Sequence, residues 1–173
     1  MQLEPIPLFT SAQIRQRVAG LGAAISKDFA GRDLIVVAVL KSSVIFVADL
    51  LRTLSIPVEL EFIRARSYRR TRSQGTVEFL CLPEQLLSGK YVLVVEDIID
   101  TGRTLSAVLD TLAAEGPAQL AVCALLDKPA RREAAVQADY VGFTIEDHFV
   151  VGYGLDYEQH ARELPDIRVL VDQ

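Results

Sequence analysis

An uninterrupted apolar run at residues 34–40, Leu-Ile-Val-Val-Ala-Val-Leu, constrains the fold of this chain more than any other segment. A strand with one exposed face alternates apolar and polar side chains, whereas this run is apolar on both faces. Such a strand is typical of the middle of a parallel sheet that helices cover on both sides. Residues 91–95 and 120–126 are similarly apolar, so we expect two further buried strands there.

Segments with helical periodicity lie between these strands. Thr10 and Gln13 have the spacing of a capping box, and Gly31 is expected to end the helix that they begin. The expected core-facing residues of that helix are Ile14, Val18, Leu21 and Ile25. Those of two later helices are Val47, Leu50, Leu51 and Leu54, and Leu105, Val108, Leu109 and Leu112. Strand and helix alternate, which predicts an α/β fold with a parallel β-sheet flanked by helices and joined by right-handed crossovers.

We expect one domain across residues 1–173, because that length suits one core and no repeat, linker or low-complexity segment divides it. A strand with alternating pattern begins at residue 58, and residues 76–80 are expected to form its return strand. An arginine-rich polar stretch at residues 67–75 separates the two strands. A loop of that length inside a compact domain is usually a lid or a binding loop. Arginines in and beside the loop are Arg64, Arg66, Arg69, Arg70 and Arg72.

Composition and charge exclude several classes of protein. The formal net charge is −5, the wrong sign for a protein that binds nucleic-acid phosphates. No apolar run approaches the ~18 residues that span a bilayer, and the first residues do not have the pattern of a secretory signal. Cys81 and Cys123 lie in apolar, strand-like runs, so we expect buried, reduced thiols in a cytoplasmic protein without nucleic-acid or membrane partners.

Residues 94–104, Val-Val-Glu-Asp-Ile-Ile-Asp-Thr-Gly-Arg-Thr, hold the densest group of chemically active side chains. We expect residues 96–104 to lie between a strand and the first turn of a helix, where open α/β sheets bind ligands. Glycine, threonine hydroxyls and N–H groups at a helix start can cradle a phosphate. The carboxylates of Glu96, Asp97 and Asp100 would repel that phosphate, so they should face hydroxyls, protons or a metal. A sugar with a 5′-phosphate and a vicinal diol satisfies both halves.

This motif resembles the phosphoribosyl-pyrophosphate motif of the type I phosphoribosyltransferases, in particular that of the hypoxanthine-guanine group. The resemblance implies that Glu96 and Asp97 hold the ribose 2′- and 3′-hydroxyls near a Mg²⁺-pyrophosphate. Asp100 would be the catalytic base that handles the purine N7 proton, and an acid at this position is typical of enzymes for 6-oxopurines. The residues that it implies around the 5′-phosphate are Thr101, Gly102, Arg103 and Thr104.

The same resemblance implies two pyrophosphate-binding segments. Lys41 and Ser42 follow the strand at residues 34–40 and precede a helix, a geometry that binds anions. Relatives commonly have glycine where this chain has Ser42, which leaves the shape of the loop open. Helix capping by Ser42 or Ser43 is an alternative that is compatible with phosphate binding. Arg162 matches a pyrophosphate-binding arginine, and a surface ion pair is its alternative.

The last third of the chain matches the purine end of the family's pocket. Lys128 would contact the 6-oxo group of the base. The run Phe-Val-Val-Gly-Tyr-Gly-Leu-Asp-Tyr at residues 149–157 matches a family signature in which Phe149 stacks on the base, Val150 offers backbone groups and Asp156 binds Mg²⁺. Glu96 and Asp97 complete the implied metal site. His148 stands where relatives usually have lysine, and no role follows for it.

The resemblance also implies the rest of the architecture and the reaction. A small hood contributed by the chain ends would bind the purine with residues 128–173, and a mobile lid loop would cover about 65–78, with Ser67 and Tyr68 in it. A solvated hairpin is the alternative for this arginine-rich loop.

The expected activity is purine salvage: transfer of the phosphoribosyl group from 5-phosphoribosyl 1-pyrophosphate to N9 of hypoxanthine or guanine, giving IMP or GMP and pyrophosphate. Mg²⁺ would be the cofactor and a homodimer or homotetramer the assembly. Alternatives are a xanthine-preferring enzyme and an RNA-binding attenuation regulator on the same fold. The net charge of −5 and the presence of Asp100 argue against the regulator.

Overall fold

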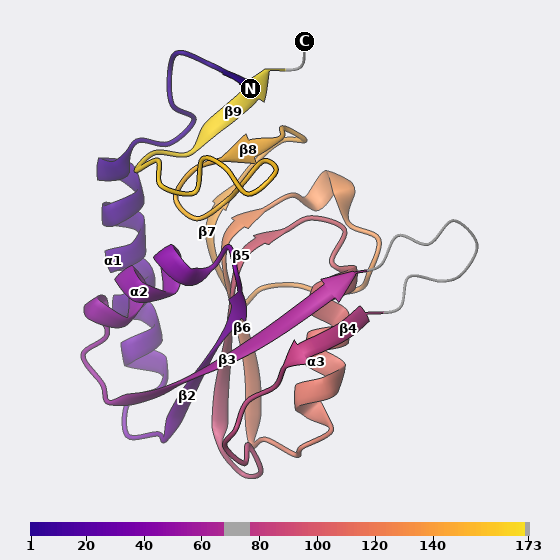
Figure 1. Ribbon diagram of the computed structural model, residues 1–173. Helices are drawn as coiled ribbons and strands as arrows, with labels where there is room; N and C mark the ends of the chain where they lie inside the picture. Colours follow the sequence, from indigo (N-terminus) through magenta and orange to yellow (C-terminus); the bar gives the residue numbers. More distant parts are fainter. Residues whose placement is uncertain (68–76, 172–173) are drawn as a thin grey trace.

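A six-stranded sheet forms the centre of the molecule in the computed structural model, which describes residues 1–67 and 77–171 (Figure 1). Its strand order is β4-β3-β2-β5-β6-β7. All neighbouring pairs are parallel except β3 and β4, which are antiparallel. The strands are β2 (Leu34–Leu40), β3 (Val58–Ser67), β4 (Val77–Cys81), β5 (Tyr91–Ile99), β6 (Gln119–Asp127) and β7 (Tyr140–Thr144). The predicted α/β fold with a mainly parallel sheet is confirmed.

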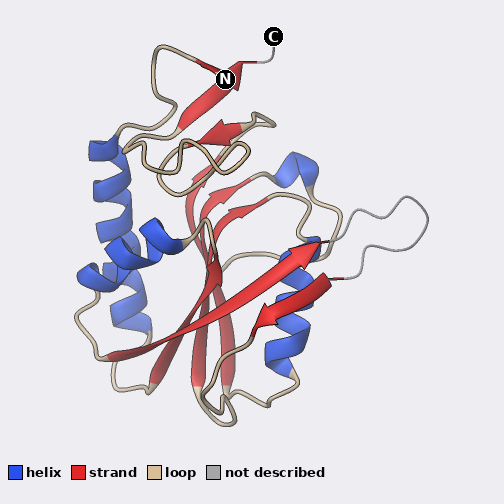
Figure 2. Ribbon diagram, viewed as in Figure 1, coloured by secondary structure: helices blue, strands red, loops and turns tan. Residues whose placement is uncertain are grey.

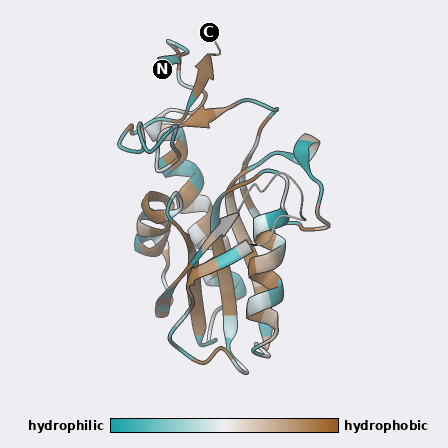
Figure 3. Cartoon of the chain, turned by 45° about the vertical axis from the view of Figure 1, so that its right-hand side comes forward, coloured by the Kyte–Doolittle hydropathy of each residue, from teal (hydrophilic) through white to brown (hydrophobic). Residues whose placement is uncertain are grey.

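Helices cover both faces of this sheet, as the doubly apolar run at residues 34–40 predicted (Figure 2). Helices α1 (Ser11–Asp28) and α2 (Val44–Thr53) lie on one face, and α3 (Arg103–Ala113) lies on the other. Strand β2 pairs with β3 on one side and β5 on the other, so it occupies the interior of the sheet. The central strands are largely hydrophobic (Figure 3).

Two apolar cores result, one on each face. Alternate residues of β2 divide between them: Val36 packs with α1 and α2, and Val37 packs with α3. Residues of the first helix that were predicted to face the core are all buried, namely Ile14, Val18, Leu21 and Ile25. The capping box of Thr10 and Gln13 is also formed, although α1 ends at Asp28 rather than at Gly31.

The other predicted elements need small corrections. In α2 the fully buried side chains are Phe46, Val47 and Leu50, whereas Leu51 is only partly buried and Leu54 lies just beyond the helix end. Phe46 was missed, although it lies four residues before Leu50 and so has the spacing of the same helical face. The return strand at residues 76–80 is observed as β4, Val77–Cys81, and Cys81 is exposed rather than buried.

Strand β5 is longer than predicted, and this changes where the carboxylates lie. It extends to Ile99, so Glu96 and Asp97 belong to the strand and not to the loop after it. Up to Val95 its side chains alternate regularly between the two cores, but Ile98 packs in the same core as Val95. The alternation therefore shifts by one residue at Glu96 and Asp97. Since β6 keeps its pairing with β5 beyond this point, the sheet accommodates the shift without ending the strand.

A second, three-stranded sheet lies beyond the carboxyl ends of the central strands (Figure 1). It has the order β1-β9-β8 and is antiparallel, and its strands are β1 (Gln2–Leu3), β9 (Arg168–Val171) and β8 (Val150–Val151). Segments from both ends of the chain thus lie side by side. None of the described helices is long and apolar enough to cross a membrane.

Candidate active site

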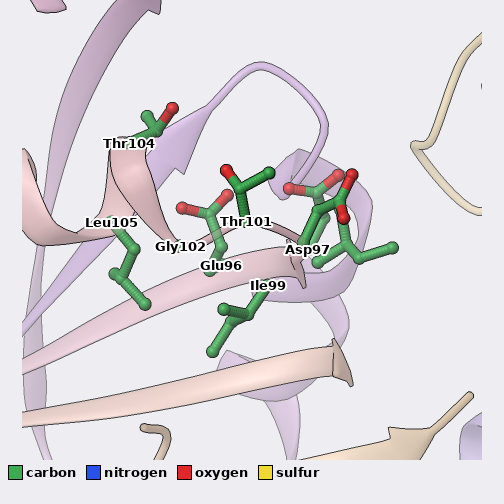
Figure 4. Close-up of a pocket in the computed structure, with 9 residues that line it drawn as sticks. Glu96, Asp97, Ile99, Thr101, Gly102, Thr104 and Leu105 are labelled. Atoms are coloured by element: carbon green, nitrogen blue, oxygen red, sulfur yellow. The ribbon is translucent and has the colours of Figure 1, made fainter. Parts of the chain in front are cut away.

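A hollow of about 210 Å³ opens at the carboxyl end of β5, where the strand turns into α3 (Figure 4). The side chains of Glu96, Asp97 and Thr101 extend to one side of the ribbon, whereas Ile99 and Leu105 extend to the other (Figure 4). The shift in side-chain alternation brings consecutive carboxylates to the same side. The hollow is lined by Glu96, Asp97, Ile98, Ile99, Asp100, Thr101, Gly102, Thr104 and Leu105.

Glu96 and Asp97 form a buried pair of acids, each with only 8% of its surface exposed. Burial raises the pKa of Glu96 well above its ordinary value, and the negative charge of Asp97 adds to the effect. The pKa of Asp97 is also raised by burial, although its hydrogen bond with Glu96, neighbouring backbone groups and the positive charge of Arg162 partly offset the increase. The pair therefore favours a partner that supplies hydroxyl protons or positive charge.

The turn after the strand has the properties of a phosphate cradle. Gly102 is the N-cap of α3 and has φ of 80°, which glycine adopts without strain. A Cβ at this position would lie 2.6 Å from Cγ2 of Val136, so only glycine fits. The backbone N–H groups of the first turn of α3 have no partner within the helix. The cradle thus combines these donors with the hydroxyls of Thr101 and Thr104.

Contacts with residues 131–136 hold the cradle in place. The carbonyl oxygen of Thr101 accepts hydrogen bonds from the backbone N–H groups of Glu133, at 2.9 Å, and Ala134, at 3.0 Å. The guanidinium of Arg103 pairs with Glu133 at 2.5 Å. In this structure the side chain of Arg103 therefore braces the turn, and its backbone N–H belongs to the cradle.

The pyrophosphate candidates come from loops far apart in sequence and meet beside this hollow. Nη1 of Arg162 donates to Oγ of Ser42 at 2.8 Å, and Nη2 lies 2.7 Å from Oδ1 of Asp156. Nζ of Lys41 lies 3.4 Å from Oε1 of Gln159, which also accepts from Arg162. The structure thus brings together Lys41, Ser42, Asp156 and Arg162, with Gln159 between them.

Two features explain how Ser42 is accommodated. Its φ is not among the positive values of the described non-glycine residues, so its backbone does not need the freedom of glycine. The loop that carries Arg162 approaches closely because Gly154 has no side chain: a Cβ there would lie 2.2 Å from the carbonyl oxygen of Ser42. Ser43 is the N-cap of α2, but its Oγ donates to the carbonyl oxygen of Val39 and does not cap the helix.

The purine candidates come from the end of β6 and from β8 with the residue before it. Lys128 is buried, and its backbone N–H donates to the carbonyl oxygen of Ile99 at 2.9 Å, which places it beside the end of β5. Val150 is buried in β8. Phe149 is 51% exposed and packs edge-on against Tyr157, with ring centroids 5.8 Å apart. An exposed aromatic face of this kind is available for stacking.

Other predicted residues contribute less to this geometry. Nε2 of His148 lies 3.6 Å from Oε2 of Glu146, and among the described residues His148 forms no ion pair with a candidate residue. Ser67 ends β3, and Tyr68, with the rest of the expected lid at residues 68–76, lies outside the described residues. Within the described ranges no three acidic, histidine or cysteine side chains form a metal-binding group.

Sequence reasoning missed Gln159, Glu133, Arg131 and Asp147, although each contacts a candidate residue. Arg131 follows the same strand end as Lys128, and residues after neighbouring parallel strands share one edge of the sheet. That placement could have identified Arg131. The contacts of Gln159 and Glu133 depend on how loops fold back, and no local pattern signals them.

Comparisons with known proteins agree with this geometry. The sequence model of the phosphoribosyl transferase domain family matches residues 8–158. The chain is 43% identical to the hypoxanthine phosphoribosyltransferase of Salmonella typhimurium, over 96% of each chain. It is 44% identical to the hypoxanthine-guanine phosphoribosyltransferase of Mycobacterium avium, over 94% of this chain and 84% of that protein. A crystal structure of a hypoxanthine-guanine phosphoribosyltransferase from Bacillus anthracis has a TM-score of 0.93 and 42% identity, covering 98% of this chain and 100% of that one.

Proposed function

Because this chain belongs to the phosphoribosyltransferase family, we propose that it is a purine-salvage enzyme that transfers phosphoribosyl from 5-phosphoribosyl 1-pyrophosphate to hypoxanthine or guanine. The products are IMP or GMP and pyrophosphate. The observation that carries the proposal is the hollow at the end of β5. It holds two buried carboxylates on one side and a glycine-containing helix start on the other, which suit the diol and the 5′-phosphate of one ribose.

Preference for a 6-oxopurine rests on Asp100 and Lys128. The N7 and O6 atoms of such a base lie next to each other on one edge. A carboxylate accepts the N7 proton, and an ammonium group donates to O6. Adenine has an amino group in place of O6, which would face the ammonium of Lys128 donor to donor. Phe149 provides a face for stacking, and the backbone of Val150 provides donors and acceptors for the remaining edge.

The reaction needs the residues in three roles. The bond between C1′ and the pyrophosphate oxygen breaks as an oxocarbenium-like ribose forms, and N9 of the purine attacks C1′ with inversion. Lys41 and Arg162 bind the departing pyrophosphate and stabilise its developing charge. Asp100 takes the proton that the purine loses from N7 as its N9 bonds to carbon. Glu96 and Asp97 orient the ribose.

The donor set also fits Mg²⁺. Burial raises the pKa values of Glu96 and Asp97, so a cation beside the pair would favour their charged forms, and Asp156 lies beside the pyrophosphate arginine. Oxygen ligands that are few in number, completed by substrate phosphates and water, are the usual protein environment of this ion. When bound, Mg²⁺ supplies positive charge to the pyrophosphate. Because the described residues contain no preassembled group of three metal-binding side chains, we propose that Asp156 and the pair of Glu96 and Asp97 would hold it together with oxygens of the substrate.

Further parts of the proposal follow the family. The sheet of β1, β9 and β8, with residues 128–173, serves as the purine-binding hood. The protein acts in the cytoplasm as a homodimer or homotetramer.

A panel of bases tests the activity. The protein is saturated with 5-phosphoribosyl 1-pyrophosphate and Mg²⁺, and kcat/KM is measured for hypoxanthine, guanine, xanthine, adenine and uracil. Hypoxanthine or guanine should exceed adenine and uracil by about 100-fold or more, because buried polar groups are left unpaired by the wrong base. A panel led by xanthine would favour the alternative, a xanthine-preferring enzyme. One led by adenine or uracil would refute the assignment of Asp100 and Lys128.

A further inference from the structure

Four side chains of alternating charge connect the two groups that we assign to the purine. Nε of Arg131 lies 3.0 Å from Oδ1 of Asp100, and its Nη1 lies 3.4 Å from Oδ2 of Asp147. The other oxygen of Asp147, Oδ1, lies 3.8 Å from Nζ of Lys128. The order is Asp100, Arg131, Asp147, Lys128, so every charge has an opposite neighbour.

The backbone fixes where Arg131 lies. The short 3₁₀ turn η1 (Pro129–Arg131) follows β6, and the N–H of Arg131 donates to the carbonyl oxygen of Lys128 at 3.2 Å. Because β6 and β5 are paired to their ends, with Asp127 opposite Ile99, this turn lies beside the start of the phosphate motif. Lys128 and Arg131 therefore flank Asp100 from one short segment.

Charge and exposure fit a positioning role better than a role in stability. The side chains of Arg131 and Asp100 are 44% and 42% exposed, so their ion pair adds little to folding. The negative charge of Asp100 and then the hydrogen bond to Asp147 raise the pKa of the Arg131 guanidinium. Arg131 thus stays positively charged between the two acids.

The bond to Arg131 engages one of the two oxygens of Asp100. A carboxylate has two oxygens, and Oδ1 of Asp100 is the one bonded to Nε of Arg131. Among the described residues no group donates to Oδ2. Because the planar guanidinium contacts Asp100 through Nε and Asp147 through Nη1, it restricts the orientation of the Asp100 carboxylate and so the direction in which Oδ2 points.

We infer that Arg131, with Asp147, is a positioning residue that fixes Asp100 and Lys128 as an acceptor and a donor spaced for the N7 and O6 edge of a 6-oxopurine. This inference rests on the proposed function, because it uses the roles of Asp100 and Lys128. Arg131 acts through Asp100 and does not itself contact the base. Asp147 acts through Arg131 and through Lys128.

Steady-state kinetics on the full chain test this with hypoxanthine and 5-phosphoribosyl 1-pyrophosphate as substrates. Arg131→Gln should lower kcat by about tenfold or more, because a misplaced base is costly to catalysis, and should leave KM for 5-phosphoribosyl 1-pyrophosphate within about twofold. Arg131→Lys keeps the charge and one bond, so it should recover part of the loss. Asp147→Asn should raise KM for hypoxanthine about fivefold, since it also releases Lys128. Lys90→Gln, which removes an exposed ion pair with Asp33 at the opposite end of β5, is the matched control.

A double-mutant cycle separates the inference from the proposed function. If Arg131 acts through Asp100, Arg131→Gln should cause no further loss in kcat in the Asp100→Asn background. An equal loss in that background, or a kcat within twofold of the parent for Arg131→Gln alone, would overturn the inference. A near-normal kcat for Asp100→Asn alone would instead refute the base role of Asp100, and the inference would be lost with it.

Discussion

Nη2 of Arg162 lies 2.7 Å from Oδ1 of Asp156, so the proposed pyrophosphate-binding arginine and the proposed metal ligand form an ion pair. The two side chains are only 23% and 21% exposed, and Arg162 is further held by Ser42 and by the carbonyl oxygen of Gly154. Such a pair keeps both charges in place before substrate arrives. When pyrophosphate and Mg²⁺ bind, we expect Arg162 to pair with the pyrophosphate and Asp156 to pair with the metal, so each charge keeps an opposite partner.

Removing the acid of this pair should therefore affect metal binding first. For Asp156→Asn we expect the Mg²⁺ concentration for half-maximal activity to rise by about tenfold, because the site loses a charged oxygen ligand. Titration of activity with Mg²⁺ at saturating substrates measures this. Glu158→Gln, which changes an exposed acid on the same loop, should leave the titration unchanged. An unaltered Mg²⁺ requirement in Asp156→Asn would exclude Asp156 as a ligand.

Mutation of the two neighbouring serines in the pyrophosphate loop should affect different properties, substrate binding for Ser42 and stability for Ser43. Ser42→Ala removes the hydroxyl bonded to Arg162 and should raise KM for 5-phosphoribosyl 1-pyrophosphate roughly fivefold, about 1 kcal/mol, with little change in stability. Ser43→Ala removes a buried bond to the carbonyl oxygen of Val39 and should lower the free energy of unfolding by about 1–2 kcal/mol. Kinetics and denaturant unfolding of both variants measure the contrast. A KM effect from Ser43 alone would contradict the assignment.

Gly102 should be much less tolerant of substitution than Gly116, although both have positive φ. Gly102→Ala places a Cβ 2.6 Å from Val136 and should cost about 2–4 kcal/mol in stability or distort the cradle, with loss of 5-phosphoribosyl 1-pyrophosphate binding. Gly116→Ala meets no atom within 4 Å and should cost only about 1 kcal/mol. Thermal unfolding and calorimetric binding compare them. Equal effects at the two positions would show that crowding at the cradle is unimportant.

The raised pKa of Glu96 has a consequence for stability without metal. At a pH between the ordinary carboxyl range and this raised pKa, folded Glu96 keeps a proton that the unfolded chain has lost. Stability should therefore fall as pH rises through that window. In Glu96→Gln the slope should flatten, and the variant should be more stable at neutral pH by on the order of 1 kcal/mol while it binds ribose phosphate less well. Urea unfolding at several pH values in the presence of a chelator is the measurement, and an unchanged slope would contradict the pKa assignment.

The central sheet could be predicted because its strands are long apolar runs whose burial depends on the local sequence. The strand at Leu34–Leu40 is apolar on both faces, which predicted helices on both sides of the sheet, and helices do cover both sides. The end of β5 could not be predicted in this way, since Glu96 and Asp97 are strand residues with the composition of a loop. Glu96 and Asp97 are buried because they line the hollow, and the hydrophobicity of their side chains does not predict this.

The candidate site was predictable where one short motif carries it and not where distant loops meet. Residues 96–102 and Thr104 do line one hollow. That Arg103 would pair with Glu133, or that Ser42 would meet Arg162 from 120 positions away, depends on tertiary contacts that periodicity does not report. The bridge from Asp100 through Arg131 to Asp147 belongs to the same class of contact.

The one-residue shift in side-chain alternation at Glu96 and Asp97 makes the length of this segment as important as its composition. A substitution there changes one group, but an insertion or deletion of one residue would restore regular alternation, in which consecutive side chains point to opposite faces. Ile98 would stay on the same side as Val95, but two consecutive carboxylates could no longer extend into the hollow together. Relatives should therefore vary between Val95 and Gly102 by replacement and not by change of length.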